Sequence, residues 1–140
     1  MKNRVHGNAF TLIELLLVMV ILVVLAAIVV PKFAGRSEQA KKTATITEIS
    51  SFKTALELFE GDNSQYPSTE QGLQALGSNV GNWQNWHGPY IENPPLNDPW
   101  GHPYIYRFPG THGTSYDLLS VGADGQEGTA DDLVGWAPNK

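Results

Sequence analysis

The first part of the chain divides sharply into a short polar start and a long apolar run. Residues 10–31 read FTLIELLLVMVILVVLAAIVVP, and Glu14 is the only charged side chain among them. As a helix, residues 12–30 would be about 28 Å long at ~1.5 Å per residue, and the hydrocarbon core of a bilayer is ~30 Å thick. The pattern therefore predicts a transmembrane helix over residues 12–30.

Glu14 is out of place in a simple membrane anchor. A charged side chain inside a bilayer segment costs ~3 kcal/mol at mid-membrane and less near the edge. We therefore expect Glu14 to have a partner and a functional role. The alternative is that Glu14 lies at the level of the lipid headgroups, where its charge has little consequence.

The alternation of apolar and polar residues after the apolar run predicts that the helix continues. Pro31 should bend or weaken it, because proline removes one backbone hydrogen bond and clashes with the preceding turn. Apolar residues then recur at helical spacing and predict a core-facing stripe, made of Ile46, Ile49, Phe52, Leu56 and Phe59. The opposite, polar face carries Lys41, Glu48, Thr54 and Glu57. Gly61 and the polar residues after it end a helix predicted from about Thr11 to about Glu60.

Shorter elements follow in the last half of the chain. Ser68 and Gln71 have the spacing of a capping box and predict a second, short helix with Leu73 and Leu76 on its apolar side. Residues 77–99 are rich in Gly, Asn, Pro and Trp and indicate a loop, in which the tryptophans cover a small core or, alternatively, bind a sugar. Segments 104–107 and 116–121 predict strands joined by a turn-rich connection over residues 109–114.

The N-terminal residues themselves allow two interpretations. A secretory signal peptide has an apolar stretch of only 7–15 residues followed by a small-residue cleavage site, whereas here Pro31 and Lys32 follow a longer run. The small residue Ala9 precedes the run instead. Cleavage after Ala9 would remove a basic leader with Lys2 and Arg4 and leave the apolar segment on the mature chain.

This arrangement resembles the class III leader and first helix of type IV pilins and type II secretion pseudopilins. The resemblance implies that an inner-membrane peptidase cuts between Ala9 and Phe10 and methylates the new amine of Phe10. The family usually has glycine before the cut, so with Ala9 we expect slower processing. It also implies that Glu14 pairs with the Phe10 amine of a neighbouring subunit, which favours docked subunits because an unpaired buried charge is costly.

Composition narrows the classes of function. The net charge is −5, cysteine is absent, and from residue 54 to residue 139 Arg107 is the only basic side chain. The same stretch holds many acids: Glu57, Glu60, Asp62, Glu70, Glu92, Asp98, Asp117, Asp124, Glu127, Asp131 and Asp132. Such a domain is not expected to bind nucleic acid through phosphates. The histidines lack zinc-type spacing and no nucleophile motif is visible, so we predict no catalytic residues.

The last acidic segment has the chemistry of a calcium loop. Asp124, Asp131 and Asp132 are close in sequence, and three like charges are unfavourable together without a cation. The glycines between residues 122 and 128 allow the backbone to curl so that carbonyls point inward. An unliganded, solvated loop is the alternative, and the spacing alone does not decide between them.

Three further segments resemble the major pseudopilins of type II secretion systems, so that the similarity covers nearly the whole chain. They are LFEGDNSQYPSTEQGLQAL at 58–76, NDPWGHPY at 97–104, and SVGADG at 120–125 followed by Asp131 and Asp132. In that family the corresponding loop binds one calcium ion. Carried over, the side-chain ligands are Asp124, Asp131 and Asp132, and the carbonyl ligands are those of Val121, Gln126 and Thr129.

The resemblance implies an α+β, type IV pilin-like fold, in which a long N-terminal helix packs on a small antiparallel sheet with a C-terminal calcium-binding loop. The predicted segments are a leader at 1–9, a transmembrane and assembly helix at 10–31, and a periplasmic domain at 32–140. The implied function is a structural subunit that polymerises into the periplasmic pseudopilus of a type II secretion system in a bacterial inner membrane. Implied partners are further copies, minor pseudopilins, the assembly platform and the prepilin peptidase. The alternatives are a type IV pilus or competence pilin, and a membrane-anchored calcium- or carbohydrate-binding module.

Overall fold

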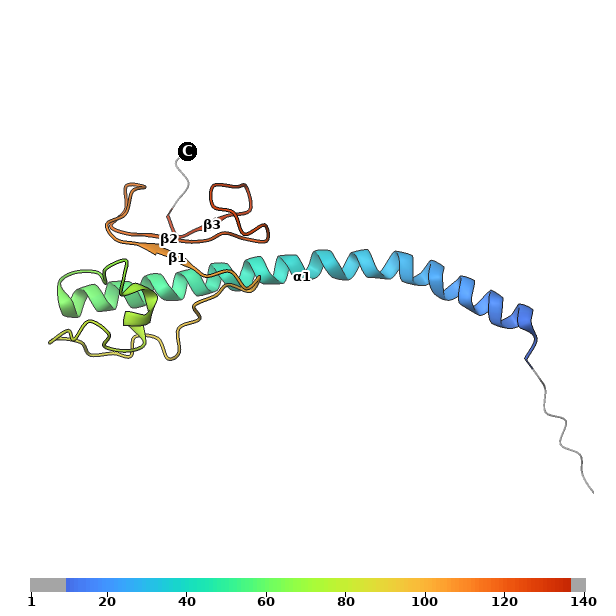
Figure 1. The fold of residues 1–140 in the computed structure, drawn as a ribbon, viewed down its shortest axis with the longest axis horizontal. Helices are drawn as coiled ribbons and strands as arrows, with labels where there is room; N and C mark the ends of the chain where they lie inside the picture. Colours follow the sequence, from blue (N-terminus) through green and yellow to red (C-terminus); the bar gives the residue numbers. More distant parts are fainter. Residues whose placement is uncertain (1–9, 137–140) are drawn as a thin grey trace, which may run out of the picture. The chain divides into compact units, whose positions relative to one another are not determined.

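Figure 1 shows a computed structural model of the chain, which describes residues 10–136, except for the side chains of residues 29–34. The predicted leader at 1–9 lies outside the described residues, and so do the side chain of Pro31 and those at the end of the predicted span 12–30. Contacts divide the chain into two compact units, Met1–Gln39 and Ala40–Lys140, which are described separately below.

The predicted long helix is confirmed. Helix α1 runs over Leu12–Asn63, and it continues through Pro31 without a break in its helical assignment. It ends slightly later than the Gly61 signal predicted, because the stop is made by Ser64, whose φ of 59° leaves the helical region. Ser64 N–H donates to the Glu60 carbonyl at 2.7 Å and the Asn63 side-chain amide donates to the Phe59 carbonyl at 3.0 Å, so these two carbonyls of the last turn have partners.

The core of the 40–140 unit forms on the predicted apolar stripe of α1, with one correction. Leu56 and Phe59 have no exposed surface, and Ile49 and Phe52 are almost fully buried. The prediction for Ile46 was wrong, because its side chain is 58% exposed.

Helical geometry explains why Thr45 takes the place predicted for Ile46. A residue four positions before Ile49 lies closer to the buried stripe than one three positions before it. Thr45 is fully buried, and its hydroxyl is satisfied because it donates to the Lys41 carbonyl at 2.9 Å.

The polar face of α1 also needs a correction. Thr54 and Glu57 are exposed as predicted, but Glu48 is half-buried and accepts a hydrogen bond from the Tyr104 hydroxyl. Lys41 is half-buried as well, with its ammonium 5.9 Å from the centre of the Trp100 ring. The domain therefore covers more of the circumference of the helix than the apolar stripe alone predicts, because aromatic side chains reach around its edges.

The predicted second helix is present as a single short turn. Residues Gly72–Leu76 form the 3-10 helix η1, with Leu73 and Leu76 buried. The predicted capping box forms just before it: Ser68 N–H donates to Gln71 Oε1 at 3.0 Å, and Gln71 N–H donates to Ser68 Oγ at 3.3 Å. The two hydrogen bonds of the predicted capping box are thus confirmed. The helix that follows is a five-residue 3-10 helix and not an α-helix.

A small antiparallel sheet completes the 40–140 unit. Strands β1 (Ile105–Arg107), β2 (Asp117–Ser120) and β3 (Leu133–Val134) lie in the order β1-β2-β3, with Tyr106 opposite Leu118 and Leu119 opposite Val134. The first two strands were predicted to within about a residue at each end, and β3 was not predicted. Side chains of the sheet and of η1 belong to the same core cluster as residues 49–59 of α1, and Figure 1 shows the sheet and η1 beside this part of the helix.

The two loop tryptophans cover this core. The Trp83 ring meets Phe59 edge-on with 5.3 Å between ring centres, and Trp86 Nε1–H donates to the Ala75 carbonyl at 3.0 Å. Both rings are partly buried against the core cluster. Their arrangement supports the interpretation that they shield the core.

Candidate functional site

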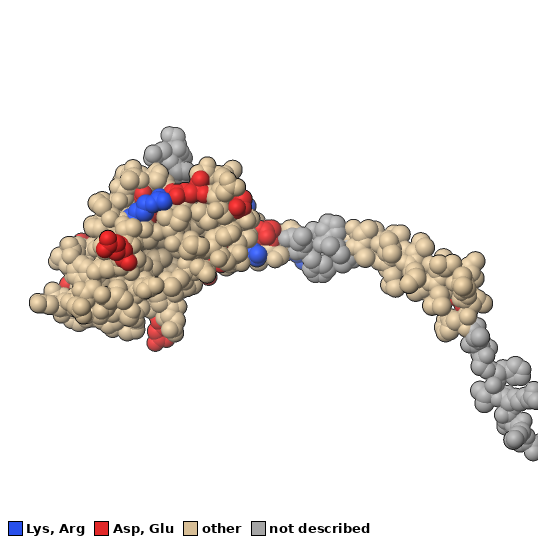
Figure 2. Space-filling model, viewed as in Figure 1, with Lys and Arg blue, Asp and Glu red and all other residues tan. Residues whose placement is uncertain are grey.

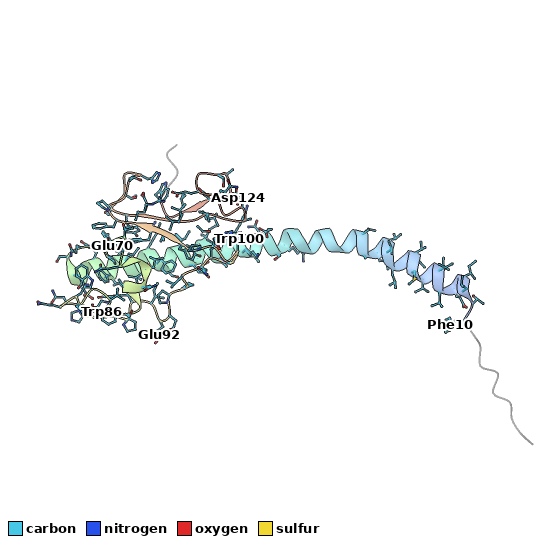
Figure 3. All side chains as sticks on the ribbon, viewed as in Figure 1. Phe10, Glu70, Trp86, Glu92, Trp100 and Asp124 are labelled. Carbon is cyan, nitrogen blue, oxygen red and sulfur yellow. The ribbon has the colours of Figure 1, made fainter. Side chains whose placement is uncertain are left out.

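The start of α1 presents apolar side chains to its surroundings. Within the 1–39 unit every described large apolar residue is exposed, and Phe10, labelled in Figure 3 just before the helix begins, is 80% exposed. A set of aliphatic side chains this exposed is not stable against water on its own and indicates a surface that is covered by lipid or by other helices. Among the residues whose side chains are described, no helix is both long enough and apolar enough to pass through a membrane.

Glu14 has a local partner that the sequence analysis missed. Thr11 N–H and Thr11 Oγ–H both donate to Glu14 Oε2 at 3.1 Å, and Glu14 N–H donates to Thr11 Oγ1 at 3.3 Å. These reciprocal bonds are a capping box, which satisfies otherwise free N–H groups at the start of the helix. The spacing Thr-x-x-Glu before an apolar run was the signal that could have predicted it. Ala9, the other side of the predicted cleavage site, lies outside the described residues.

The C-terminal acidic loop joins β2 to β3 and is folded around its own carboxylates. Asp131 Oδ2 accepts hydrogen bonds from the N–H groups of Ala123 (2.8 Å) and Asp124 (3.1 Å). Asp131 Oδ1 accepts one from the hydroxyl of Thr129 at 2.6 Å. The other two predicted carboxylate ligands each accept from a backbone N–H, Asp124 from Gln126 at 2.8 Å and Asp132 from Gly128 at 2.7 Å.

The predicted carbonyl ligands come from the same loop. Val121 is buried at the end of β2, whereas Gln126 and Thr129 are exposed at the tip, where the Thr129 hydroxyl also lies 3.2 Å from the Gln126 carbonyl. Gly122 has a φ of 63°, and a Cβ there would lie 2.5 Å from the Asp131 carbonyl oxygen. Only glycine therefore fits at this turn, as the sequence analysis expected of the loop glycines.

The electrostatics of the loop fit a hard cation. Hydrogen bonds from Thr129 and from the N–H groups of the loop lower the pKa of Asp131 to about 2, so this carboxylate is charged over the whole physiological range. Asp132 Oδ1 is buried and has no hydrogen-bond partner among the residues that the structure describes. The six predicted ligands are all oxygens and three of them are carboxylates, which suits calcium better than zinc. Among the described residues, no three or more His, Asp or Glu side chains lie close enough together to hold a metal ion.

The only basic residue of the acidic stretch, Arg107, holds this loop against β1. Its guanidinium binds Glu127 through two hydrogen bonds of 2.6 and 2.7 Å, and the two side chains are 40% and 42% exposed. The carboxylate of Glu127 raises the pKa of Arg107, and Arg107 lowers the pKa of Glu127. Glu127 is therefore engaged in an ion pair and not directed at the predicted calcium ligands. Figure 2 shows the acidic side chains at several separate places on the visible face of this unit.

Sequence reasoning did not find a polar cluster at the base of the loop. Asp98, which is buried, accepts hydrogen bonds from the N–H groups of Trp100 (3.0 Å) and His102 (2.9 Å) and from the hydroxyl of Ser120. His102 Nδ1 lies 2.8 Å from the Gly122 carbonyl oxygen. Asp98 and Ser120 lie 22 positions apart in the chain, so no local pattern could have paired them.

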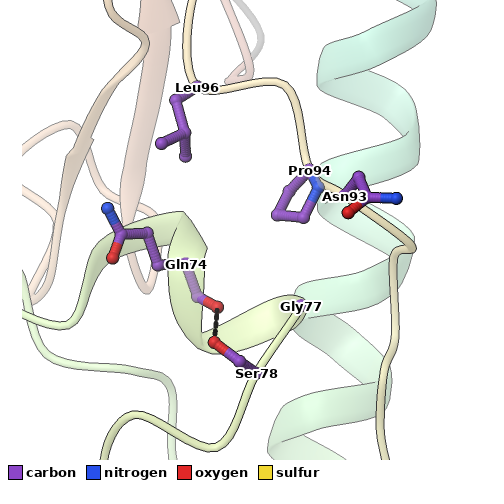
Figure 4. Close-up of a pocket in the computed structure, with 6 residues that line it drawn as sticks. All are labelled: Gln74, Gly77, Ser78, Asn93, Pro94 and Leu96. Atoms are coloured by element: carbon purple, nitrogen blue, oxygen red, sulfur yellow. Dashed lines mark hydrogen bonds between the residues drawn. The ribbon is translucent and has the colours of Figure 1, made fainter.

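One surface hollow of the 40–140 unit has no titratable side chain in its lining. The hollow between η1 and the 93–96 segment has a volume of about 300 Å³ and is drawn in Figure 4. None of its lining residues is titratable: Gln74, Gly77, Ser78, Asn93, Pro94 and Leu96. We take the start of α1 and the 121–132 loop as the candidate functional sites, because they hold the residues that the sequence predicts to act.

Comparison with known families bears directly on both sites. A family model described as "Type II secretion system (T2SS), protein G" matches residues 32–136, and one described as "Prokaryotic N-terminal methylation motif" matches residues 6–30. The chain belongs to the type II secretion system protein G family. The second match includes the predicted cleavage site and Glu14.

Several relatives match this chain over almost its full length and over almost their own. A protein from Pseudomonas aeruginosa named "Type II secretion system core protein G" is 47% identical, over 96% of this chain and 98% of that protein. Proteins of the same name from Escherichia coli K12 and Vibrio cholerae are each 42% identical, over 100% and 97% of this chain and 98% and 96% of theirs.

A solved structure agrees with these relatives. The crystal structure of the major pseudopilin from the type 2 secretion system of enterohaemorrhagic Escherichia coli matches with a TM-score of 0.62 and 34% sequence identity. The match covers 71% of this chain and 86% of that one. These matches confirm the predicted relationship to major pseudopilins. They also confirm the general fold, which is a long helix with a small antiparallel sheet.

Proposed function

We propose that the chain is a structural subunit that polymerises into the periplasmic pseudopilus of a type II secretion system and helps to drive folded proteins across the outer membrane. The family match supports this function. The observation on the molecule itself that carries it is the start of α1, where exposed aliphatic side chains surround one capped carboxylate, Glu14. This surface suits repeated packing between copies of one helix, and the role that we assign to it is structural and not enzymatic.

The subunit would first be held in the bacterial inner membrane by residues 10–31, with residues 32–140 in the periplasm. The methylation motif and the apolar run support this location. We propose that a prepilin peptidase cuts between Ala9 and Phe10 and methylates the amine of Phe10. The subunit would then leave the membrane by joining other copies, with minor pseudopilins and an inner-membrane assembly platform as further partners.

Glu14 would serve in two ways. Within its own chain it completes the capping box with Thr11. In the fibre its charge would pair with the Phe10 amine of a neighbouring subunit, where removing one partner of a buried pair costs ~3–5 kcal/mol. The pairing would thus favour the assembled subunit over the isolated one.

The 121–132 loop would bind one calcium ion. The proposed ligands are the carboxylates of Asp124, Asp131 and Asp132 and the carbonyls of Val121, Gln126 and Thr129. The buried Asp132 Oδ1, which has no partner within residues 10–136, supports the proposal, since a cation would give this oxygen a contact. Bound calcium would offset most of the negative charge of the three carboxylates and stabilise the fold of the periplasmic domain.

Glu14→Gln tests the assembly proposal. Glutamine can also occupy the third helical position of a capping box, so this change removes the charge and retains the cap. We expect the variant to insert into the membrane like the wild type but to form few or no fibres on overexpression, as counted by electron cryo-microscopy. Thr11→Ala is the matched control, because it removes the cap and keeps the charge, and it should still assemble. Normal fibres from Glu14→Gln would contradict the pairing.

A further inference from the structure

Four residues form a closed hydrogen-bond network at the base of the 121–132 loop. His102 N–H donates to Asp98 Oδ1 at 2.9 Å, and the Ser120 hydroxyl donates to Asp98 Oδ2. Ser120 Oγ in turn accepts from Gly122 N–H at 3.2 Å. His102 Nδ1 lies 2.8 Å from the Gly122 carbonyl oxygen, which closes the circuit. We call Asp98, His102, Ser120 and Gly122 the 98–122 network.

The centre of this network is buried. Asp98 is 5% exposed and Ser120 has no exposed surface. Leaving a buried carboxylate without one of its donors is costly, so the bonds to Asp98 hold the backbone of residues 98–102 and the end of β2 together. The network is therefore a fixed feature of the fold from which the loop departs.

His102 contacts the loop at two points. A carbonyl oxygen can only accept a hydrogen bond, so Nδ1 carries the proton that is shared with Gly122. The other side of the ring lies against Gly125, where a Cβ would be 2.9 Å from His102 Nε2. The imidazole thus holds the start of the loop through its hydrogen bond to Gly122. Its other edge contacts the backbone at Gly125 and limits how closely that turn can approach.

Peptide planarity transmits these contacts to two proposed ligands. The N–H of Gly122 and the C=O of Val121 belong to one planar trans peptide and point in opposite directions, so the bond to Ser120 fixes the direction of the Val121 carbonyl. The C=O of Gly122 and the N–H of Ala123 share the next peptide. The His102 bond therefore orients Ala123 N–H, which donates to Asp131 Oδ2 at 2.8 Å.

We propose that the 98–122 network preorganises the loop for calcium, with His102 as the positioning residue that closes the circuit. The proposal rests on the calcium site proposed above and assigns His102 no direct contact with the ion. Changing residues just outside a metal's ligands typically weakens metal binding by ~10–100-fold, because the ligands must then be ordered at the moment of binding. We expect an effect at the lower end of this range.

The test compares His102→Asn with His102→Gln in the full chain, held in detergent micelles. The amide nitrogen of asparagine can take the place of Nδ1, whereas glutamine is one carbon longer and places its amide near the position of Nε2. After removal of calcium with a chelator, isothermal titration with calcium chloride gives Kd, and thermal unfolding is followed with calcium and with chelator. His87→Gln is the matched control, because the His87 side chain is 73% exposed and pairs with Asp62 instead.

We expect Kd to rise about tenfold for His102→Gln and less than about threefold for His102→Asn and His87→Gln. The gain in melting temperature on adding calcium should shrink in His102→Gln alone. Equal Kd values for wild type and His102→Gln, or a fall in melting temperature that is the same with calcium and with chelator, would overturn the role of His102 and leave the calcium site standing. A wild-type chain that binds no calcium would instead overturn the calcium site itself.

Discussion

At the scale of single residues, Asp117 is a buried carboxylate whose charge is controlled by its hydrogen-bond donors. Its carboxylate has no exposed surface, and Oδ2 accepts hydrogen bonds from Thr111 N–H (3.0 Å) and Thr111 Oγ–H (2.7 Å). His112 donates through its N–H to Oδ1, its Nδ1 lies 3.0 Å from Oδ2, and its ring stacks on Trp136. Burial acts to raise the pKa of Asp117, but the donated hydrogen bonds outweigh burial and lower this pKa to about 2 from 3.8.

This lowered pKa predicts how stability depends on acid. Because the folded pKa of Asp117 is below the unfolded value, its contribution is complete above about pH 4 and is lost as the pH falls toward about 2. At ~1.36 kcal/mol per pKa unit the contribution is about 2 kcal/mol. Urea unfolding of residues 32–140 across this range should show the loss in the wild type. In Asp117→Asn the slope should be smaller, and equal slopes in the two proteins would contradict the assignment.

At the scale of elements, the second half of α1 should be sensitive to changes on one face only. Leu56 has no exposed surface, so Leu56→Ala should lower the free energy of unfolding by ~2–5 kcal/mol through lost burial and a residual cavity. Ile46→Ala, on the same helix, should change it by less than ~0.5 kcal/mol, since Ile46 is 58% exposed. Denaturant unfolding measures both, and a large loss from Ile46→Ala would contradict the burial described here.

The elements that could be predicted are those with a periodic local pattern. The 3.6-residue repeat predicts α1, and the Ser68–Gln71 spacing predicts the bonds before η1. The same reasoning failed at Thr45, because it counted only apolar residues and this hydroxyl is buried with its own helix carbonyl as partner. Strand β3 was missed because two residues are too few to show an alternating pattern.

The 121–132 loop gives a second prediction for an element. The proposed calcium ion would bind only the folded loop, so calcium should stabilise the domain by ~2.7 kcal/mol at a hundredfold excess over Kd. Asp124→Ala and Asp131→Ala should each lose most of this gain, because each removes a proposed anionic ligand. Melting of residues 32–140 with calcium, with magnesium and with chelator measures it, and magnesium should substitute poorly because it is smaller and strictly octahedral.

Glu127→Ala is the matched control for the proposed calcium ligands. It removes an acid from the same loop but breaks only the pair with Arg107, whose partners are 40% and 42% exposed. Such surface pairs contribute at most ~1 kcal/mol, so the calcium-dependent gain should remain. Identical melting temperatures for the wild type with calcium and with chelator would mean that the loop binds no calcium under these conditions.

At the scale of the whole molecule, the two candidate sites differ in how far the sequence reveals them. Residues 10–14 are contiguous, so the exceptional charge of Glu14 and its spacing from Thr11 are visible in the sequence. The loop carboxylates are also local. The 98–122 network is different, because it joins the 98–102 turn to the end of β2 and depends on how the sheet places them, which no local pattern records.

Processing of the N-terminus tests the proposed maturation of the subunit before assembly. If the chain is cut after Ala9, mature protein from the membrane should begin with N-methyl-Phe10, and mass spectrometry of the N-terminal peptide should detect it. The methylation motif at residues 6–30 supports this expectation. Ala9→Gly should raise the mature fraction at a fixed time after synthesis, because glycine is the residue that the family usually has before the cut. Mature protein that starts near Lys32, or that keeps Met1, would contradict the proposed processing, because the exposed apolar helix and Glu14 would then not begin the assembled subunit.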